Sequence, residues 1–147
     1  MTSPFAWLLD TNVVSELMRP FPNRAVLSFL GRRGAATLGI AAVTEWEILN
    51  GFGKMAAGGR RSELEARFRA FRERLFGDRI AEWASDEART CARIMEEKRR
   101  RGESLDARLP DALLAAVAVR RGLTIVTRNT RDFRSTGART VNPWKDP

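Results

Sequence analysis

Apolar and polar residues follow two different periods along the chain, and these periods divide it into predicted strands and helices. Short apolar runs predict strands at Phe5–Leu9, Thr37–Ala42 and Leu123–Thr127, of which the last is the clearest. Two shorter strands are expected within residues 79–83 and 139–144, the second of them at an edge of the sheet. The chain is therefore predicted to contain short strands that lie far apart in sequence.

Helical spacing, together with helix start and stop residues, fills the segments between these strands. Asn23 is a suitable N-cap, and Pro110 suits the first turn of a helix. Ser62 and Glu65 form a predicted capping box. Helices are expected at residues 12–18, 24–33, 45–57, 62–75, 85 to about 100, and 110–121. Strands that alternate with helices predict an α/β domain with a mostly parallel central sheet.

The length of 147 residues fits one domain, residues 1–147, and the sequence contains neither an internal repeat nor a linker. Apolar residues make up 44% of the chain, which is enough for a hydrophobic core and argues against disorder. The N-terminus lacks a basic segment followed by a long apolar one, and the apolar run at residues 112–119 is too short to span a bilayer. A soluble, cytoplasmic protein without a membrane segment is therefore expected.

Polar side chains gather next to the predicted strand ends and helix starts. Asp10 closes the first strand, and Glu47 lies in the first turn of the helix expected after the second strand. Asp111 lies in the first turn of the helix before the clearest strand, and Asn129 and Asp132 follow that strand. In a parallel α/β sheet these positions share one edge, which is where ligands bind. We therefore expect the four carboxylates to converge on one side of the sheet.

Each of these acids also has a purely structural explanation. Asp10 suits the N-cap of the first helix, and Asp132 suits a turn. Thr44 and Glu47 fit a capping box, and Asp111 suits the dipole at a helix start. Four carboxylates packed together would nevertheless repel one another, and a divalent cation removes that repulsion. Oxygen ligands without histidine or a cysteine cluster indicate Mg²⁺ or Mn²⁺.

The composition narrows the chemistry further. The net charge is +8, no histidine is present, and Cys91 is the single cysteine. These counts exclude an internal disulfide, a zinc site of the usual Cys/His kind, and catalysis by Ser-His, Cys-His or paired histidines. An arginine-rich chain suits a polyanion such as nucleic acid, although a solvated basic surface explains the charge equally well. Combined with an acidic metal site, the first interpretation predicts a nuclease whose arginines hold the phosphate backbone.

Four segments of the sequence, with a short closing motif, resemble a known family. The segments are "LLDTNVVSEL", "AAVTEWEILNG", "LPDALLAAVA" and "LTIVTRNTRDF", and the closing motif is "VNPW". In this order and in their strand and helix context, they resemble the PIN domain, and more narrowly the VapC-type toxins of bacterial toxin–antitoxin pairs. The resemblance spans about Leu8 to Trp144. It implies a three-layer α/β/α fold and a magnesium-dependent ribonuclease, with Mn²⁺ as an alternative ion. It also implies an RNA substrate, a small inhibitory antitoxin and a homodimer.

The resemblance assigns the catalytic acids residue by residue. Asp10, Glu47 and Asp111 take the first three acidic positions, and Asp10 and Asp111 are the expected metal ligands. Glu47 is preferred to Glu45 because of its spacing from the neighbouring threonine and glycine.

At the fourth acidic position, family members often carry aspartate where this chain has Asn129. We expect Asp132 to take that role as a catalytic acid, with Asn129 in a supporting one. The other residues expected at the site are Thr11 and Asn12, which suit orientation of Asp10, and Arg128 and Arg131, which suit contact with RNA. Helix capping and solvated loop charge explain these last four residues equally well.

Two alternative functions make different demands on the sequence. A phosphotransferase of the haloacid dehalogenase type also opens with a strand and an aspartate, but it needs a second aspartate where this chain has Asn12. A catalytically inactive nucleic-acid-binding module would not need Asp10, Glu47 and Asp111. Metal-dependent RNA cleavage separates such a module from a nuclease.

Overall fold

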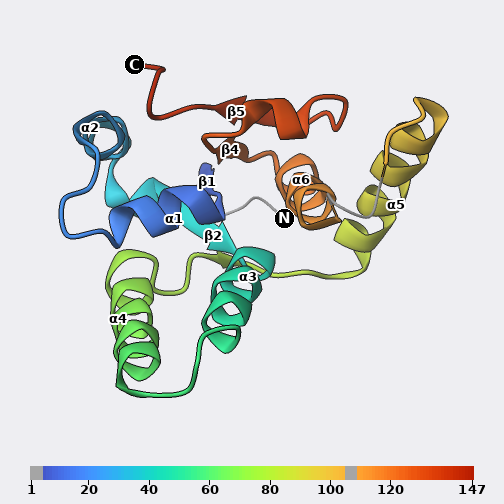
Figure 1. Ribbon diagram of the computed structural model, residues 1–147. Coiled ribbons are helices and arrows are strands. Elements are labelled where there is room, and N and C mark those ends of the chain that lie inside the picture. Colours follow the sequence, from blue (N-terminus) through green and yellow to red (C-terminus); the bar gives the residue numbers. More distant parts are fainter. Residues whose placement is uncertain (1–4, 105–108) are drawn as a thin grey trace.

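The computed structural model of the protein describes residues 5–104 and 109–147, and a five-stranded sheet lies at its centre (Figure 1). The strands are β1 (Trp7–Leu9), β2 (Leu38–Ala41), β3 (Ile80–Ala81), β4 (Thr124–Val126) and β5 (Arg139–Val141). Their order in the sheet is β3-β2-β1-β4-β5, and every pairing between neighbours is parallel. The expected parallel α/β fold is confirmed, with β5 at an edge as predicted.

Six α-helices surround the sheet in the described part of the chain. They are α1 (Thr11–Leu17), α2 (Arg24–Arg33), α3 (Ala42–Gly53), α4 (Gly59–Leu75), α5 (Ser85–Arg100) and α6 (Leu109–Arg121). Short 3-10 helices, which the sequence analysis did not predict, form at η1 (Ala35–Thr37) and η3 (Thr130–Phe133). The pair formed by α3 and α4 extends away from the sheet (Figure 1).

Alternation of side chains along the strands builds a separate core on each face of the sheet. Leu8 and Ile125, which are register partners, belong to the core under α5 and α6. Leu9 and Val126, one position further along, belong to the core under α1, α2 and α4. The result is the three-layer α/β/α arrangement that the family resemblance implied.

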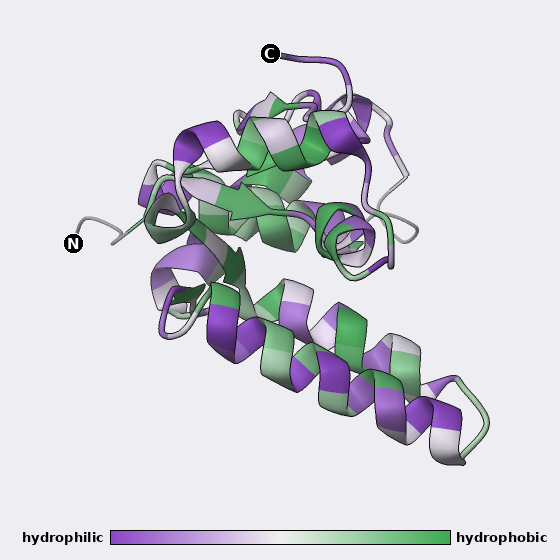
Figure 2. Ribbon diagram, turned by 90° about the vertical axis from the view of Figure 1, so that its left-hand side faces the viewer, coloured by the Kyte–Doolittle hydropathy of each residue, from purple (hydrophilic) through white to green (hydrophobic). Residues whose placement is uncertain are grey.

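Hydropathy follows the same layers. The strands and the inward sides of the helices are hydrophobic, while hydrophilic residues cover much of the outside (Figure 2). Every helix in residues 5–104 and 109–147 falls short of the length and apolarity that crossing a bilayer requires.

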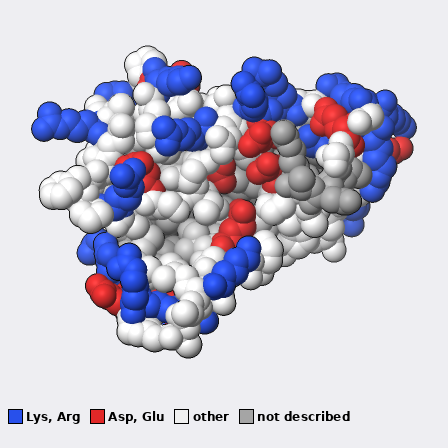
Figure 3. All heavy atoms as spheres, in the orientation of Figure 1, with Lys and Arg blue, Asp and Glu red and all other residues white. Residues whose placement is uncertain are grey.

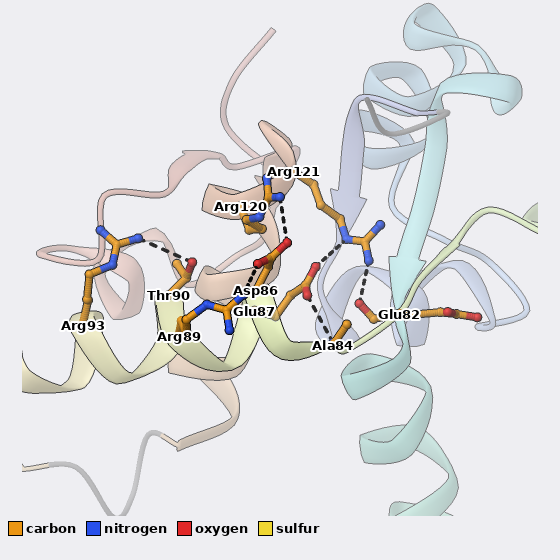
Figure 4. A network of polar contacts seen from close by, with 9 residues as sticks. All are labelled: Glu82, Ala84, Asp86, Glu87, Arg89, Thr90, Arg93, Arg120 and Arg121. Atoms are coloured by element: carbon orange, nitrogen blue, oxygen red, sulfur yellow. Dashed lines mark hydrogen bonds and ion pairs between the residues drawn. The ribbon is translucent and has the colours of Figure 1, made fainter. Parts of the chain in front are cut away.

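Helices α5 and α6 lie side by side and are joined at one end by ion pairs (Figure 4). Arg121, at the end of α6, donates to the Glu87 carboxylate at 3.0 Å and to the Glu82 carbonyl at 2.8 Å. Arg120 donates to Asp86 at 2.8 Å. Because these contacts join the end of α6 to the start of α5, the two helices run antiparallel. The start of α6 therefore lies at the opposite end of the pair, which is the end that carries Asp111.

The helix after β2 begins earlier than predicted. Helix α3 starts at Ala42 and ends at Gly53, whereas a helix over residues 45–57 was expected. The extended Ala41 is both the last residue of β2 and the N-cap of α3, and it makes no side-chain capping hydrogen bond. The first residues of α3, which were predicted to be strand and connection, therefore form helix. The proposed Thr44–Glu47 capping box is therefore wrong. Thr44 lies inside α3, and its buried hydroxyl lacks a hydrogen-bond partner among the described residues.

The capping box proposed at Ser62 is also wrong. Helix α4 begins at Gly59, with Gly58 as its N-cap, so Ser62 lies inside the first turn instead of before it. Glu65 instead pairs with Arg61, at 2.7 Å. Gly58 and Gly59 directly follow the helix expected at residues 45–57, where glycine suits a helix end, although glycine also occurs at N-caps.

A close contact inside the sheet gives a test of this packing. We expect Gly39→Ala to lower the free energy of unfolding by about 1–3 kcal/mol, the usual cost of overpacking a core. A Cβ at Gly39 would lie 2.5 Å from the Phe5 ring and 2.7 Å from the backbone oxygen of Arg79. Urea denaturation measures the change.

Gly31→Ala in α2 is the matched control, because a Cβ there meets nothing within 4 Å. In an exposed helix this change is expected to stabilise the fold by up to about 1 kcal/mol. Equal midpoints for the two variants would contradict the described packing of β2 against Phe5.

Candidate active site

The candidate site lies at the carboxyl ends of the adjacent strands β1 and β4. The chain leaves β1 through α1 and α2 towards β2, whereas it leaves β4 through η3 towards β5. These connections go to opposite sides of the β1–β4 pair, so the strand order reverses between the two strands. Such a reversal leaves a crevice at the carboxyl ends of the strands, where α/β proteins bind ligands. Asp10 follows β1 directly, and Thr127 follows β4.

Asp10 is almost fully buried, with 8% of its surface exposed, and hydrogen bonds hold both of its carboxylate oxygens. The Thr127 hydroxyl donates to Oδ2 at 2.8 Å, across the crevice between the two strands. The Thr11 backbone N–H donates to Oδ1 at 2.8 Å, which makes Asp10 the N-cap of α1. The Asn12 amide also donates to Oδ2, at 3.3 Å. Asp10 therefore has the capping geometry that the sequence left open, and it also faces the crevice.

Glu47 lies next to this network. It is half-buried in the second turn of α3, and the Thr11 hydroxyl donates to its Oε1 at 3.0 Å. Glu45 points elsewhere and forms an ion pair with Arg72 of α4. The two glutamates therefore have different surroundings, and Glu47 is the one beside Asp10.

The segment after β4 brings Asp132 to the same crevice. Asp132 is partly buried in η3, close enough to Asp10 for its charge to act on that carboxyl group. Asn129 is exposed and precedes η3, and its backbone oxygen accepts a hydrogen bond from the Asp132 N–H at 3.0 Å. The Asn129 backbone N–H donates to the Thr127 hydroxyl at 3.1 Å. Asn129 thus shapes the turn that carries Asp132.

Asp111 lies in the first turn of α6 and is partly exposed. Because α6 leads into β4 and β4 is parallel to β1, the start of α6 lies at the same edge of the sheet as Asp10. Helix α6 also packs against α3, the helix that carries Glu47. The fold therefore places Asp10, Glu47 and Asp132 near one another, and it places the first turn of α6, which carries Asp111, at the same edge of the sheet.

Burial and mutual repulsion disfavour the charged form of two of these carboxyl groups. Burial raises the pKa of Asp10, and the Asp132 charge raises it further, against the opposing effect of the Thr127 and Thr11 hydrogen bonds. Burial likewise raises the pKa of Glu47, and the Asp10 charge adds to that rise. A divalent cation would offset this repulsion, and carboxylate oxygens suit Mg²⁺ or Mn²⁺. Within the described residues, no three His, Cys, Asp or Glu side chains already form a metal cluster. The donor types therefore fit such an ion, although the side chains do not form a preformed cage.

The surface around the crevice carries both kinds of charge. Figure 3 shows carboxylate atoms around a hollow in the middle of this face, with many Lys and Arg atoms further out. Arg128 and Arg131, the expected RNA contacts, are both exposed beside the site. Arg131 and Asp132 line a second hollow of about 330 Å³. Negative charge at the centre and positive charge at the rim suit a phosphodiester bound through a cation.

Sequence reasoning missed Thr127 as a site residue. It was assigned only to a strand, yet it is fully buried, and its hydroxyl donates to Asp10 and accepts from Asn129. A threonine that ends an apolar strand at the ligand-binding edge was the available signal. It was hidden because threonine is also an ordinary strand residue.

Comparison with known proteins gives consistent matches over most of the chain. A sequence model of the PIN domain matches residues 7–138. The chain is 33% identical over 138 residues to the VapC ribonuclease Y4jK of Sinorhizobium fredii, which covers 94% of this chain and 97% of that protein. It is 32% identical to Toxin FitB of Neisseria gonorrhoeae, over 95% of this chain and 99% of that protein.

Solved structures agree with these sequence matches. The crystal structure of FitAcB from Neisseria gonorrhoeae superimposes with a TM-score of 0.83 at 31% identity, covering 95% of this chain and 99% of that chain. A DNA-bound VapBC structure from Salmonella typhimurium has a TM-score of 0.77 at 24% identity, over 95% and 98% of the respective chains, and so shares the fold.

Proposed function

Because the chain belongs to the PIN-domain family, among its VapC-type toxins, we propose that it is a metal-dependent endoribonuclease. In this proposal it acts in the cytoplasm as the toxin of a toxin–antitoxin pair and is inhibited by a small antitoxin. The relative named VapC ribonuclease supports the activity, and the relative named Toxin FitB supports the toxin role.

The arrangement of Asp10 carries the proposal. A carboxylate buried at a strand end would ordinarily be paired with a basic group. Asp10 is instead held by the Thr127 hydroxyl and the Thr11 N–H, and the acids Glu47 and Asp132 lie close to it. Hydrogen bonds that fix the oxygens of one acid while other acids approach are typical of a site made for a cation.

The proposal gives each residue a task. Asp10 and Asp111 would hold the ion, with Asp132 adding negative charge. The Thr11 hydroxyl orients Glu47, and Thr127 orients Asp10. Such an ion, when bound, offsets charge on the scissile phosphate and makes a nearby water easier to deprotonate.

RNA cleavage tests the activity. The purified chain is expected to cut single-stranded RNA with Mg²⁺ or Mn²⁺ and to stop when EDTA removes the ion. Gel analysis of a mixed-sequence RNA provides the readout. Intact RNA at every ion concentration would favour the catalytically inactive nucleic-acid-binding module instead.

The fourth acidic position has its own test. We expect Asp132→Asn to raise the magnesium concentration for half-maximal cleavage by about tenfold or more, because weakening the surroundings of a bound ion commonly costs 10- to 100-fold in affinity. Asn129→Ala should raise it much less, because Asn129 is exposed and carries no charge. Magnesium titrations of cleavage rate measure both values. A larger effect at Asn129 would reverse the assignment.

A hollow beside the site supports an inhibitory partner. It has a volume of about 430 Å³, lies between α1, α3 and α4, and includes Thr11 and Glu47. Ile48, Phe52 and Leu64 give it an apolar lining. An antitoxin segment bound there would cover apolar surface and lie against a catalytic glutamate at the same time.

Homodimer formation is a further expectation from the family, measurable by light scattering.

Expression tests the partner. Expression of the chain alone should reduce the colony count of a bacterial host at least tenfold, since RNA cleavage stops protein synthesis. Co-expression of the small protein encoded beside it should restore growth. An Asp10→Asn chain, expressed to the same level, is the control that should be harmless. Harmless, high-level expression of a chain that cuts RNA in vitro would contradict the toxin role.

A further inference from the structure

Trp144, in the closing motif that the catalytic site leaves unexplained, pairs with Arg128 of the segment after β4. The Arg128 guanidinium lies over the Trp144 ring, with its carbon 4.9 Å from the ring centroid. Trp144 is half-buried and packs against the core that includes Leu9 and Val126, whereas Arg128 is exposed. The pair therefore joins an exposed arginine to a tryptophan that is packed against the core.

Asn142 fixes both members of this pair. Its side-chain amide donates to the Arg128 backbone carbonyl at 3.3 Å, and its side-chain oxygen accepts from the Trp144 backbone N–H at 2.9 Å. Its own backbone N–H donates to Asp146 at 2.7 Å. Asn142 is buried, and its two side-chain bonds set the backbone of Arg128 relative to that of Trp144. The stack is thus positioned by a buried polar residue as well as by its own attraction.

The pair also borders the catalytic crevice. Arg128 directly follows Thr127, whose hydroxyl donates to Asp10. The Arg128 backbone N–H donates to the Asn12 side-chain oxygen at 3.2 Å, and the Asn12 amide donates in turn to Asp10. The backbone at Arg128 is therefore linked to Asp10 in two ways, through Thr127 and through Asn12.

We propose that the Arg128–Trp144 pair is a stacking platform for one base of single-stranded RNA next to the scissile phosphodiester. The inference rests on the proposed nuclease function and adds how the chain binds one base of its RNA substrate. A guanidinium plane stacks on unpaired bases as an aromatic ring does, and its charge also attracts phosphate. Trp144 holds the Arg128 guanidinium over its ring, because a cation over an indole ring is favourable.

A second arginine stack in the same chain provides the matched control. The Arg33 guanidinium lies 3.5 Å from the Phe29 ring centroid and 5.2 Å from that of Trp7. Trp7 is the first residue of β1, at the end of the strand away from Asp10. Arg33→Lys therefore removes an arginine–aromatic stack away from the site, while Arg128→Lys removes the one beside it and keeps the charge.

The test compares two fluorescent 12-mers of equal charge, oligo(A) and its abasic counterpart, bound to the full chain in EDTA. The unsubstituted chain should bind oligo(A) about tenfold more tightly than the abasic oligomer, as expected for one stacked base. Arg128→Lys should reduce this preference to about twofold, and Arg33→Lys should keep it. Trp144→Leu, which retains apolar packing, should behave like Arg128→Lys.

The outcomes distinguish failure of the proposed stacking platform from failure of the proposed nuclease function. If the preference is absent, or persists unchanged in both Arg128→Lys and Trp144→Leu, the platform is overturned, even when the chain cuts mixed-sequence RNA in Mg²⁺. If the preference depends on Arg128 but RNA stays intact in Mg²⁺, the platform stands and the nuclease function fails. A loss of preference in Arg33→Lys equal to that in Arg128→Lys would also overturn it, because the effect would then not be local.

Discussion

Asp10→Asn is expected to reduce metal-dependent RNA cleavage by roughly 10²- to 10⁴-fold, the range associated with loss of a positioned catalytic group. The substitution separates the two roles that the structure gives this residue. Asparagine is as good an N-cap as aspartate, so the bond from the Thr11 N–H to the side-chain oxygen can persist. What the substitution removes is the negative charge that a cation requires.

Stability should respond in the opposite direction from activity. Burial and the Asp132 charge raise the pKa of Asp10 in the folded chain above its unfolded value. A carboxyl group with a raised pKa favours the folded state only while it is protonated, and this contribution is lost as the pH rises through the folded-state pKa. Near neutral pH without a metal, the Asp10 carboxyl group therefore opposes folding, and its neutral replacement relieves that cost.

Thermal unfolding in EDTA measures the effect of Asp10→Asn on stability. The Tm of Asp10→Asn should equal or exceed that of the unsubstituted chain. A fall of more than about 3 °C, corresponding to roughly 1 kcal/mol in a chain of this size, would show that Asp10 serves chiefly the fold. Retention of cleavage would contradict the catalytic assignment independently.

Glu47→Gln should also reduce cleavage by roughly 10²-fold or more, whereas Glu45→Gln should leave the rate within about twofold. Glu47 accepts a hydrogen bond from Thr11 beside Asp10, while Glu45 pairs with Arg72 across the α3–α4 contact. The two substitutions are chemically identical and lie two residues apart on one helix. Steady-state cleavage rates at saturating Mg²⁺ provide the comparison.

Glu45→Gln carries its own structural expectation. Both partners of the Glu45–Arg72 pair are a quarter exposed, so its loss should cost about 1 kcal/mol or less. A slow Glu45 variant beside an active Glu47 variant would mean that the acidic positions along α3 are misassigned.

The sequence pattern predicted the parallel α/β sheet and the edge at which the acids lie, because both follow from short-range patterns, whereas the three layers were implied by the family resemblance. Leu8 and Leu9 alternate between the two cores, and the acids follow strands whose parallel pairing fixes their common edge. Gly34 and Gly122 ended their helices as expected, each with a positive φ that favours glycine.

The errors arose where one residue type serves two local structures. Thr44 followed by Glu47 matches a capping box, yet the helix begins directly at the end of β2, so Thr44 lies inside it. The 3-10 helix η3 depends on how the chain after β4 returns to the edge strand. Its four residues are too few to carry a helical period.

The contacts of the site depended on packing that the sequence does not encode locally. The Thr127–Asp10 bond joins residues 117 apart, and the Thr11–Glu47 bond joins residues 36 apart. The sequence predicted that these elements meet at one edge, but which hydroxyl faces which carboxylate follows from register and helix rotation. The different surroundings of Glu45 and Glu47 likewise depend on Arg72, which pairs with Glu45 from the neighbouring helix α4.

Anomalous diffraction from crystals soaked in Mn²⁺ tests the central claim most directly. The account predicts a manganese peak in the crevice at the carboxyl ends of β1 and β4, bound by Asp10 and Asp111 and absent in crystals of Asp10→Asn. A peak elsewhere, or none at this edge while Asp10 serves only as the cap of α1, would contradict it.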